Sequence, residues 1–362
     1  MSAALPLPNS VVVDSLRDGI VIPAHPLALT AERKLDERRQ RALSRYYLDA
    51  GAAGLAVGVH TTQFAIREPQ HGLLRPVLEL AAETIREHEE KTGSRIVRVA
   101  GVCGQTEDAL RDAELARELG YDLGLLNLSA FPDADDVTLL AHARRIAEVI
   151  PLFGFYLQPD IGGRLLSRKF FREFAAIPNL IAVKMAVFDR ELTREAIEGI
   201  EDSGRGDEVI LYTGNDNLII EDLTEGYLIP TANGTKLCRM AGGLLGHWAV
   251  WTKAAVETLE MIKAARSHET FDPAGFAELA SQVTEMNHYL FDFDNAFHGC
   301  IPGVHEILRR QGLMEGTWCL NPDEILSPRQ AEALTRVSEA CPHLVDDVFV
   351  AESLDRWMTD SA

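Results

Sequence analysis

Leu180-Ile181-Ala182-Val183-Lys184-Met185-Ala186 is an apolar run that contains one lysine, and the turn pair Pro178-Asn179 precedes it. The run is too short for a typical helix, so it predicts a buried β-strand. Alternation along a strand places Leu180, Ala182 and Lys184 on one face. A buried lysine is costly unless it is neutral, paired or reactive, because desolvation lowers the pKa of its amine. We interpret Lys184 as a candidate nucleophile; the alternative is a strand-end lysine whose ammonium reaches water.

Apolar runs of this kind recur along the chain and alternate with amphipathic segments. They fall at Gly19–Ala24, Gly54–Val59, Ile96–Cys103, Leu123–Leu128, Leu152–Leu157, Leu180–Met185, Val209–Tyr212 and Tyr227–Ile229. Helical periodicity separates them, for example over residues 30–51, 106–120 and 137–150. Eight near-continuous apolar strands alternating with helices predict an α/β fold with a parallel sheet, a (β/α)8 TIM barrel. The alternative is a doubly wound open sheet, whose G-x-G-x-x-G fingerprint the sequence lacks.

The strand pattern stops at about Thr235, and the rest of the chain is predicted to be helical. Helices are expected over residues 241–265, 274–291, 301–311 and 328–340. The glycine-rich stretch 242–246 lies in the first of these and is interpreted as a close contact between helices. We therefore expect an N-terminal lead-in over residues 1–16, the barrel over 17–234 and a C-terminal helical region over 235–362.

Composition and charge exclude several classes of protein. The chain has 35 basic and 55 acidic residues, a formal charge of -20, which disfavours binding to nucleic acid or to an anionic membrane surface. No apolar run reaches the roughly 18–20 residues of a membrane span, and the first 15 residues lack the features of a signal peptide, so a cytoplasmic location is expected. The five cysteines are widely spread, and the histidines form no H-E-x-x-H motif, so neither disulfides nor a metal site is predicted.

Further candidate residues lie where strands of a barrel end. Reactive groups in such barrels sit at the C-terminal ends of the strands, where both Lys184 and Tyr156 are expected to point into the same cavity. Alternation places Leu152, Gly154 and Tyr156 on one face, and Gly154 would leave room beneath the phenol. The alternative is a core tyrosine that has merely found a hydrogen-bond partner. After the second run, His60-Thr61-Thr62-Gln63 offers hydroxyl and N–H groups that could hold a carboxylate.

These stretches resemble a known family. Phe155-Tyr156-Leu157-Gln158-Pro159, followed by residues 177–184, is similar to the tyrosine-x-x-proline strand and the lysine strand of the dihydrodipicolinate synthase and N-acetylneuraminate lyase superfamily. The resemblance runs in order from about Gly19 to Ala340. Its other landmarks are Val99–Val102 with Gly120–Asp122, Gly214–Asp216 and Gly226–Asn233.

The resemblance implies a class I aldolase on a (β/α)8 barrel with a helical C-terminal extension. Lys184 would attack the ketone of a 2-oxo acid such as pyruvate to form a Schiff base, and Tyr156 would relay protons, without any cofactor. The other residues that it implies contact the substrate are His60, Thr61, Thr62, Gly214, Asp216, Leu228 and Thr231. It also implies a small-molecule 2-oxo acid and an aldehyde as reaction partners, and a homo-oligomer, either a tetramer or a dimer.

The sequence departs from the family at several positions. The family's carboxylate-binding Gly-Thr-Thr-Gly-Glu corresponds to residues 59–63 if Gln63 matches the glutamate, whereas a one-residue shift anchored on Gly58 gives a second register. Phe131 stands near a tyrosine of the synthases, and Ile161 stands at their substrate-binding arginine. We therefore expect a lyase that is not a dihydrodipicolinate synthase. The alternatives are a Schiff-base dehydratase of a 2-oxo-3-deoxy sugar acid and a catalytically silent metabolite-binding homologue.

Overall fold

Eight parallel strands belong to one sheet in the computed structural model, which describes residues 4–231 and 234–359. The strands are β1 (Val21–Pro23), β2 (Gly54–Val57), β3 (Val97–Val102), β4 (Leu123–Leu126), β5 (Leu152–Leu157), β6 (Leu180–Ala186), β7 (Ile210–Thr213) and β10 (Gly242–Leu245). Their order is β1-β10-β7-β6-β5-β4-β3-β2, and a parallel bridge between Ala24 and Ala56 joins the chain after β1 to β2. The predicted (β/α)8 TIM barrel is confirmed.

Helices separate the strands and continue after them. The α-helices are α1 (Ser10–Asp18), α2 (Glu37–Asp49), α3 (Leu74–Thr92), α4 (Thr106–Glu118), α5 (Asp136–Ala147), α6 (Arg168–Ala175), α7 (Arg190–Asp202), α8 (Ile219–Thr224), α9 (Thr252–Arg266), α10 (Ala277–Leu290), α11 (Cys300–Arg310), α12 (Gln330–Ala340) and α13 (Asp347–Trp357). The 3-10 helices are η1 (His60–Thr62), η2 (Phe64–Arg67), η3 (Pro159–Ile161), η4 (His247–Ala249), η5 (Pro273–Phe276), η6 (Phe293–Asn295) and η7 (Pro342–Leu344).

Local sequence explains where several of these helices begin. The side chains of Asp36, Asp135, Ser167 and Asp189 each accept a hydrogen bond from a backbone N–H of the first helical turn that follows. Such caps satisfy donors that have no partner inside the helix. The strands between the helices are buried on both faces, which explains their continuous apolar runs.

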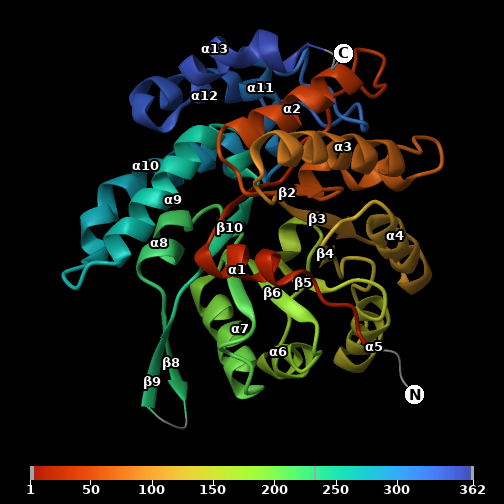
Figure 1. The fold of residues 1–362 in the computed structure, drawn as a ribbon. Helices are drawn as coiled ribbons and strands as arrows, with labels where there is room; N and C mark the ends of the chain where they lie inside the picture. Colours follow the sequence, from red (N-terminus) through yellow and green to blue (C-terminus); the bar gives the residue numbers. More distant parts are fainter. Residues whose placement is uncertain (1–3, 232–233, 360–362) are drawn as a thin grey trace. The chain divides into compact units, whose positions relative to one another are not determined.

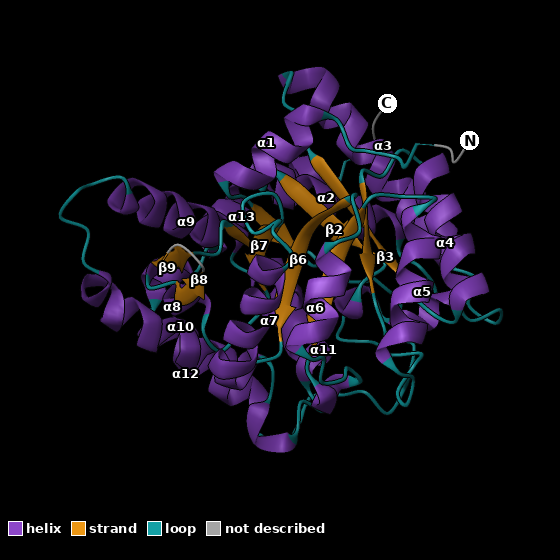
Figure 2. Ribbon diagram, turned by 90° about the horizontal axis from the view of Figure 1, so that it is seen from below, coloured by secondary structure: helices purple, strands orange, loops and turns teal. Residues whose placement is uncertain are grey.

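The chain divides into two compact units, and the first comprises Met1–Ile20 with Val97–Gly243. In this unit β3 to β7 lie side by side in parallel, and α4 to α7 pack in sequence along them (Figures 1 and 2). Helix α1 is fixed to β7 through Tyr212, whose hydroxyl donates to Leu16 O at 2.9 Å and accepts from Ile20 N at 3.2 Å. The N-terminal segment is thus anchored to the inner strands of its own unit.

The eighth strand was assigned wrongly from the sequence. The run Tyr227–Ile229 belongs to β8 (Tyr227–Thr231), which pairs antiparallel with β9 (Gly234–Cys238) in a separate two-stranded hairpin, drawn below α8 in Figure 1. The barrel strand is instead β10, so the barrel continues past residue 234. Its glycines concealed the strand: a Cβ on Gly242 would lie 2.4 Å from Ile20 O, so a close backbone contact excludes the β-branched residues that usually mark strands.

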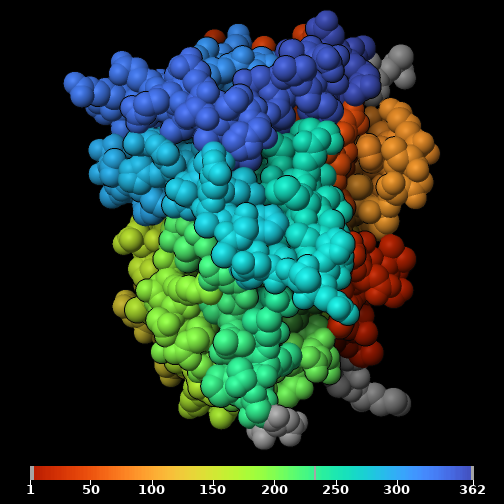
Figure 3. All heavy atoms as spheres, turned by 90° about the vertical axis from the view of Figure 1, so that its left-hand side faces the viewer, coloured from red at the N-terminus to blue at the C-terminus, as the bar shows by residue number. Residues whose placement is uncertain are grey.

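The second unit comprises Val21–Ile96 and Leu244–Ala362. Its C-terminal helices pack on one another, as the cyan and blue segments of Figure 3 show. The four predicted C-terminal helices correspond to α9, α10, α11 and α12, while α13 was not predicted. Hydrogen bonds connect α2 to α13 and to the residue just before α13. Tyr46 of α2 donates to Asp346 at 2.7 Å, and Trp357 of α13 donates to Asp49 of α2 at 2.7 Å.

The substitution Gly154→Ala is expected to destabilise the protein by about 1–3 kcal/mol, because the added methyl overpacks a filled core. Its Cβ would lie 2.6 Å from the Phe174 ring and 3.2 Å from Val183. Urea unfolding of the variant measures the loss. Gly275→Ala is the control, because a Cβ there meets no atom within 4 Å; equal stability of the two variants would contradict the packing argument.

Candidate active site

Lys184 lies within β6, and only 8% of its surface is exposed. Its Nζ lies 4.7 Å from the centre of the Phe155 ring, which β5 contributes. An ammonium over the face of an aromatic ring is attracted by the ring quadrupole, but this replaces only part of its lost hydration. The alternative interpretation, a strand-end lysine whose ammonium reaches water, does not fit this burial.

Strand pairing shows which face of the sheet Lys184 occupies. It pairs with Phe155 on β5 and with Tyr212 on β7, and paired residues of neighbouring strands share a face. Gly154, one residue before Phe155, points the other way, because a Cβ on it would meet Phe174 of α6. Since the helices cover the outer face, Lys184 lies on the inner face of the barrel wall.

Burial changes the acid–base behaviour of this amine. Desolvation lowers the pKa of Lys184 from its ordinary 10.5 to about 8, while the negative charge of Asp216 acts in the opposite direction. The neutral form of a lysine is the nucleophile, and a pKa near 8 gives it a substantial population near neutral pH. The inner face therefore holds an amine that can attack a carbonyl carbon.

Tyr156 does not share this face, so the prediction that its phenol and Lys184 point into one cavity is wrong. The pairing of β5 with β6 shifts by one residue: Leu152 pairs with Leu180, but Phe153 pairs with Ala182. A one-residue shift exchanges the faces of the side chains that follow. Phe155 consequently takes the position beside Lys184.

The environment of Tyr156 is that of a core residue. Its ring packs against Phe171 of α6 at 5.0 Å between centroids. Its hydroxyl makes two long hydrogen bonds with Leu166, accepting from the N–H at 3.4 Å and donating to the carbonyl at 3.5 Å. Burial raises the pKa of the Tyr156 phenol above its ordinary value. The alternative of a core tyrosine, which the sequence left open, is the one that fits.

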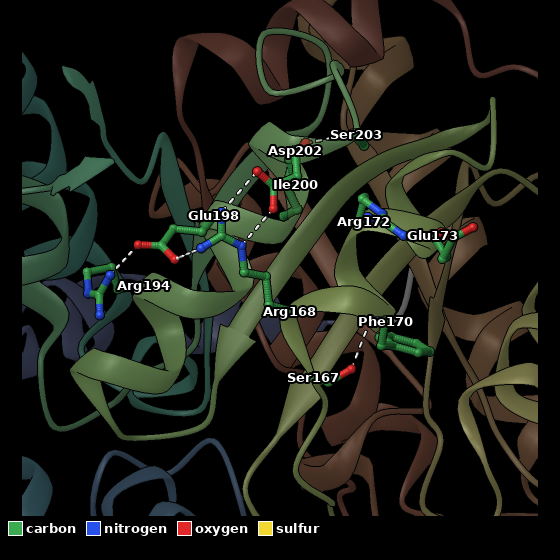
Figure 4. Close-up of polar contacts among 10 residues, drawn as sticks. All are labelled: Ser167, Arg168, Phe170, Arg172, Glu173, Arg194, Glu198, Ile200, Asp202 and Ser203. Atoms are coloured by element: carbon green, nitrogen blue, oxygen red, sulfur yellow. Dashed lines mark hydrogen bonds and ion pairs between the residues drawn. The ribbon is translucent and has the colours of Figure 1, made fainter. Parts of the chain in front are cut away.

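Charged side chains connect the helices α6 and α7 on the outer side of the sheet. Arg168 of α6 binds Asp202 of α7 through Nε at 2.6 Å and through a second nitrogen at 3.0 Å, and it also contacts Glu198 (Figure 4). Glu198 binds Arg194 as well, one turn earlier on α7. Because buried Glu198 lies between two guanidinium groups, α7 holds in place α6, the helix whose Phe171 packs against Tyr156.

The turn after β7 lies directly against Lys184. A Cβ on Gly214 would lie 2.3 Å from Lys184 Cε and 3.0 Å from the Ala186 methyl, so only glycine leaves room for the lysine side chain. Asp216, two residues later, is 92% buried, and its charge acts on Lys184. The structure thus brings Gly214 and Asp216 to the lysine, and their contact with a substrate stays a prediction.

A buried hydrogen-bond network fixes this turn. Asp222 of α8 accepts hydrogen bonds from Thr213 at 2.7 Å, from the Asn215 amide at 2.9 Å and from the Tyr227 hydroxyl at 2.5 Å. Burial raises the pKa of Asp222, and these donors lower it in part. Asn215 also accepts from the backbone N–H of Phe188 at 2.9 Å, which couples the turn to the end of β6. Sequence reasoning missed this network because its members follow no periodic pattern or motif that would indicate a buried carboxylate with three donors.

In the second unit, the loop after β2 uses its hydroxyl groups internally. Thr61 donates to Ala24 O and Thr62 to His25 O, both at 2.6 Å. Each hydroxyl has one hydrogen, so in this arrangement neither can also donate to a substrate carboxylate. The predicted contact of these hydroxyls with a substrate carboxylate stays a prediction, and it would require these two bonds to be exchanged. Carboxylate binding by the loop's backbone N–H groups or by His60 stays a prediction.

The remaining part of that loop is held within its own unit. The His60 ring packs against Phe64 at 5.9 Å, and Gln63 accepts a hydrogen bond from Leu320 N at 2.7 Å. Gln63 adopts a left-handed backbone conformation with φ of 67°, which is uncommon outside glycine. A Cβ on Gly246, after β10, would lie 3.8 Å from the Thr61 methyl, so the ends of β2 and β10 lie close together.

Leu228 and Thr231 lie on the β8–β9 hairpin and not on a barrel strand, and their contact with a substrate stays a prediction. Leu228 is 66% exposed, and the Thr231 hydroxyl donates to Gly234 O at 2.9 Å. Their resemblance to the family's eighth strand was misleading, and Ala232 and Asn233, which end that landmark, lie outside the described residues. The end of the true eighth strand is followed by His247, which the sequence did not indicate. His247 is buried and bonds Asn287 at 2.7 Å, and burial lowers its pKa to about 4.

The residues at the synthase-specific positions lie together in the first unit. Arg164 donates a hydrogen bond to the carbonyl of Phe131, which links the loop after β5 to the loop after β4. Ile161 ends the 3-10 helix η3 nearby in the chain. The guanidinium closest in sequence to Ile161 is thus already engaged by the protein backbone.

The described residues contain neither a metal-binding cluster nor a membrane-spanning helix. Over residues 4–231 and 234–359, no group of three or more His, Cys, Asp or Glu side chains is arranged to hold a metal ion. The five cysteines are free and buried. Within the same residues, every helix is too short or too polar to cross a membrane.

Comparison with solved structures identifies proteins of the same fold. The chain matches the pyruvate complex of the chloride-inhibited dihydrodipicolinate synthase from Acinetobacter baumannii with a TM-score of 0.70 and 18% identity, over 91% of this chain and 99% of the other. It matches N-acetylneuraminate lyase from Fusobacterium nucleatum with a TM-score of 0.67 and 16% identity, over 92% and 100%. A monomeric dihydrodipicolinate synthase variant matches with a TM-score of 0.70 and 17% identity, over 90% and 98%. No protein-family model matches the sequence, and neither does any curated protein.

These likenesses confirm the predicted resemblance at the level of the fold, which is that of dihydrodipicolinate synthases and N-acetylneuraminate lyases. The predicted homo-oligomer stays a prediction, since a monomeric variant is among the similar structures.

Tyr156→Phe is expected to leave catalytic turnover within a few-fold of wild type, because the phenol lies on the face opposite Lys184. Loss of its two long hydrogen bonds should lower the free energy of unfolding by about 0.5–1.5 kcal/mol. Steady-state kinetics and urea unfolding of the variant measure both effects. A loss of about 10²-fold or more in rate with an intact fold would show that the hydroxyl takes part in catalysis after all.

Proposed function

We propose that the chain is a class I aldolase of the dihydrodipicolinate synthase and N-acetylneuraminate lyase superfamily. In this proposal Lys184 forms a Schiff base with a 2-oxo acid such as pyruvate, and a C–C bond is cleaved or formed. The observation that carries it is the buried amine on the inner face of β6, whose pKa is lowered to about 8. The shared fold and the pyruvate bound in the synthase from Acinetobacter baumannii support the choice of substrate.

The chemistry follows from the neutral amine. Lys184 attacks the keto carbon, and the resulting carbinolamine loses water to give a protonated imine. The imine then accepts the electron pair of the breaking C–C bond, an aldehyde leaves, and the enamine that remains takes up a proton. Reversal of the same steps joins the 2-oxo acid to an aldehyde. No step of this sequence requires a metal or an organic cofactor.

The second substrate is proposed to be a neutral aldehyde, so the protein would not be a dihydrodipicolinate synthase. Ile161 cannot form the bidentate, charge-assisted hydrogen bonds with which an arginine holds a carboxylate. Arg164, three residues later, is engaged by the carbonyl of Phe131. A buried carboxylate without such a partner would cost several kcal/mol, an order-of-magnitude figure.

A second candidate function is a barrel that binds a 2-oxo acid without turning it over. The observations that favour it are the phenol of Tyr156 on the outer face and the Thr61 and Thr62 hydroxyls engaged by backbone carbonyls. A Schiff base that forms with pyruvate but yields no product with any aldehyde would establish this alternative.

Lys184→Met is expected to abolish the covalent adduct that borohydride traps between the wild-type protein and pyruvate, because it removes the amine but keeps an apolar side chain of similar length. Mass spectrometry of the intact protein and its peptides detects the adduct. In the wild type, the rate of adduct formation should rise with pH and level off above about 8, because only the neutral amine attacks. An adduct that persists in Lys184→Met would place the nucleophile elsewhere.

Aspartate semialdehyde is expected to be a much poorer acceptor than neutral hydroxylated or aromatic aldehydes. Comparison of kcat/KM for the aldehydes with pyruvate as donor tests this in the wild type and in Arg164→Ala. If the wild type uses the semialdehyde efficiently and Arg164→Ala does not, the site has relocated its arginine and the proposed substrate class is wrong.

A further inference from the structure

The proposed reaction needs a group that transfers protons beside Lys184. Tyr156 and Tyr212, on the two neighbouring strands, are both held by other contacts. Tyr156 lies on the outer face against Phe171. Tyr212 shares the inner face with Lys184, but its hydroxyl is bonded to Leu16 O and Ile20 N of the N-terminal segment. A phenol fixed in this way cannot follow a reacting atom on the lysine.

The turn after β7 offers a different group. Gly214 lies so close to the lysine that a Cβ would be 2.3 Å from Lys184 Cε and 2.8 Å from Cγ. The chain therefore passes the lysine within contact distance just before it reaches Asp216. Strands β5 and β7 place Phe155 and Tyr212 beside Lys184, and this turn contributes the carboxylate of Asp216, whose negative charge acts on the lysine.

Asparagine side chains fix the residues on both sides of Asp216. Asn215 accepts from Phe188 N at 2.9 Å and donates to Asp222 at 2.9 Å. Asn217 donates to Phe188 O at 3.3 Å. Phe188 itself has a left-handed backbone with φ of 59°, a conformation that persists only where its surroundings enforce it. The carboxylate of Asp216 is thus carried on a turn that is braced against the end of the lysine strand.

We propose that Asp216 is the general acid–base catalyst of the Schiff-base chemistry at Lys184, in the place of the phenol that faces the helices. This inference rests on the proposed function and names a further catalytic residue within it. A carboxylate that is 92% buried and carried on a turn in contact with the lysine is suited to the role, because carboxyl groups serve as general acids and bases when they are held beside the reacting atoms.

The proton transfers balance. When the Lys184 amine adds to the keto carbon, Asp216 accepts a proton from the nitrogen, and the keto oxygen takes up one proton from solvent to become the carbinolamine hydroxyl. The protonated carboxyl then donates that proton to the carbinolamine hydroxyl, the C–O bond breaks, water leaves and the protonated imine forms. In C–C cleavage the carboxylate accepts the proton of the hydroxyl that becomes the aldehyde oxygen, and the carboxyl then protonates the enamine carbon.

Asp216→Asn tests the proposal, since it keeps the shape of the side chain and removes its acid–base function. The rate of adduct formation with pyruvate, quenched with borohydride at a series of pH values, is expected to fall by roughly 10²–10⁴-fold. The midpoint of the pH profile should also move to lower pH, because the carboxylate no longer stabilises the Lys184 ammonium. That shift follows from the charge alone, so a role limited to charge or packing would move the midpoint and leave the rate on the high-pH plateau unchanged. Asp160→Asn is the matched control, an exposed aspartate of η3 whose loss should change neither quantity.

Asp216→Ala with added formate is the second variant, and it covers the case in which Asp216→Asn does not fold. Formate can enter the space left by the side chain, and it is expected to restore at least part of the lost rate. Wild-type rates on the high-pH plateau of Asp216→Asn, or a slow Asp216→Ala that formate does not accelerate, would overturn the proposal. If the wild type itself forms no adduct with pyruvate or other 2-oxo acids, the proposed function fails instead.

Discussion

Desolvation of the Lys184 amine is the constraint on which the candidate site depends. An ammonium in water is strongly hydrated, and burial on the inner face of β6 replaces that hydration with an aromatic ring and one carboxylate. The fold can maintain this only because neighbouring strands fix the lysine from both sides and Gly214 leaves the space that its side chain fills. The reactive form of the amine is thus a consequence of packing and requires no second basic group beside it.

The sequence was sufficient to predict the barrel fold and to identify Lys184 as a candidate nucleophile. Seven of the predicted runs correspond to strands of the barrel, because parallel strands that are buried on both faces must be apolar throughout. Lys184 was identifiable for the same reason, since a single charge in such a run is conspicuous. The face of Tyr156 was not predictable, because one unpaired residue of β6 between Leu180 and Ala182 decides it. No residue type indicates such a bulge. Regular alternation therefore predicts the wrong face for the side chains that follow it.

The prediction of the eighth strand was wrong for a related reason. Backbone contact with Ile20 requires glycine at position 242, and glycine gives no strand signal. The hairpin strand β8, whose Tyr227 and Ile229 are buried, carried the stronger pattern and displaced the true strand in the prediction. The network of Asp222, Asn215 and Thr213 was hidden in another way, because its parts become meaningful only when the fold brings them together.

The β8–β9 hairpin has a consequence for how this chain can vary. Over residues 227–231 and 234–238 its two strands pair with each other, from Tyr227 opposite Cys238 to Thr231 opposite Gly234, in a sheet separate from the barrel sheet. Side chains on a strand alternate with a period of two, so the arm can lengthen or shorten by one residue pair on each strand while every remaining residue keeps its face. The segment between α8 and β10 is therefore a place where insertions can accumulate and new surface can be added while the eight barrel strands keep their register.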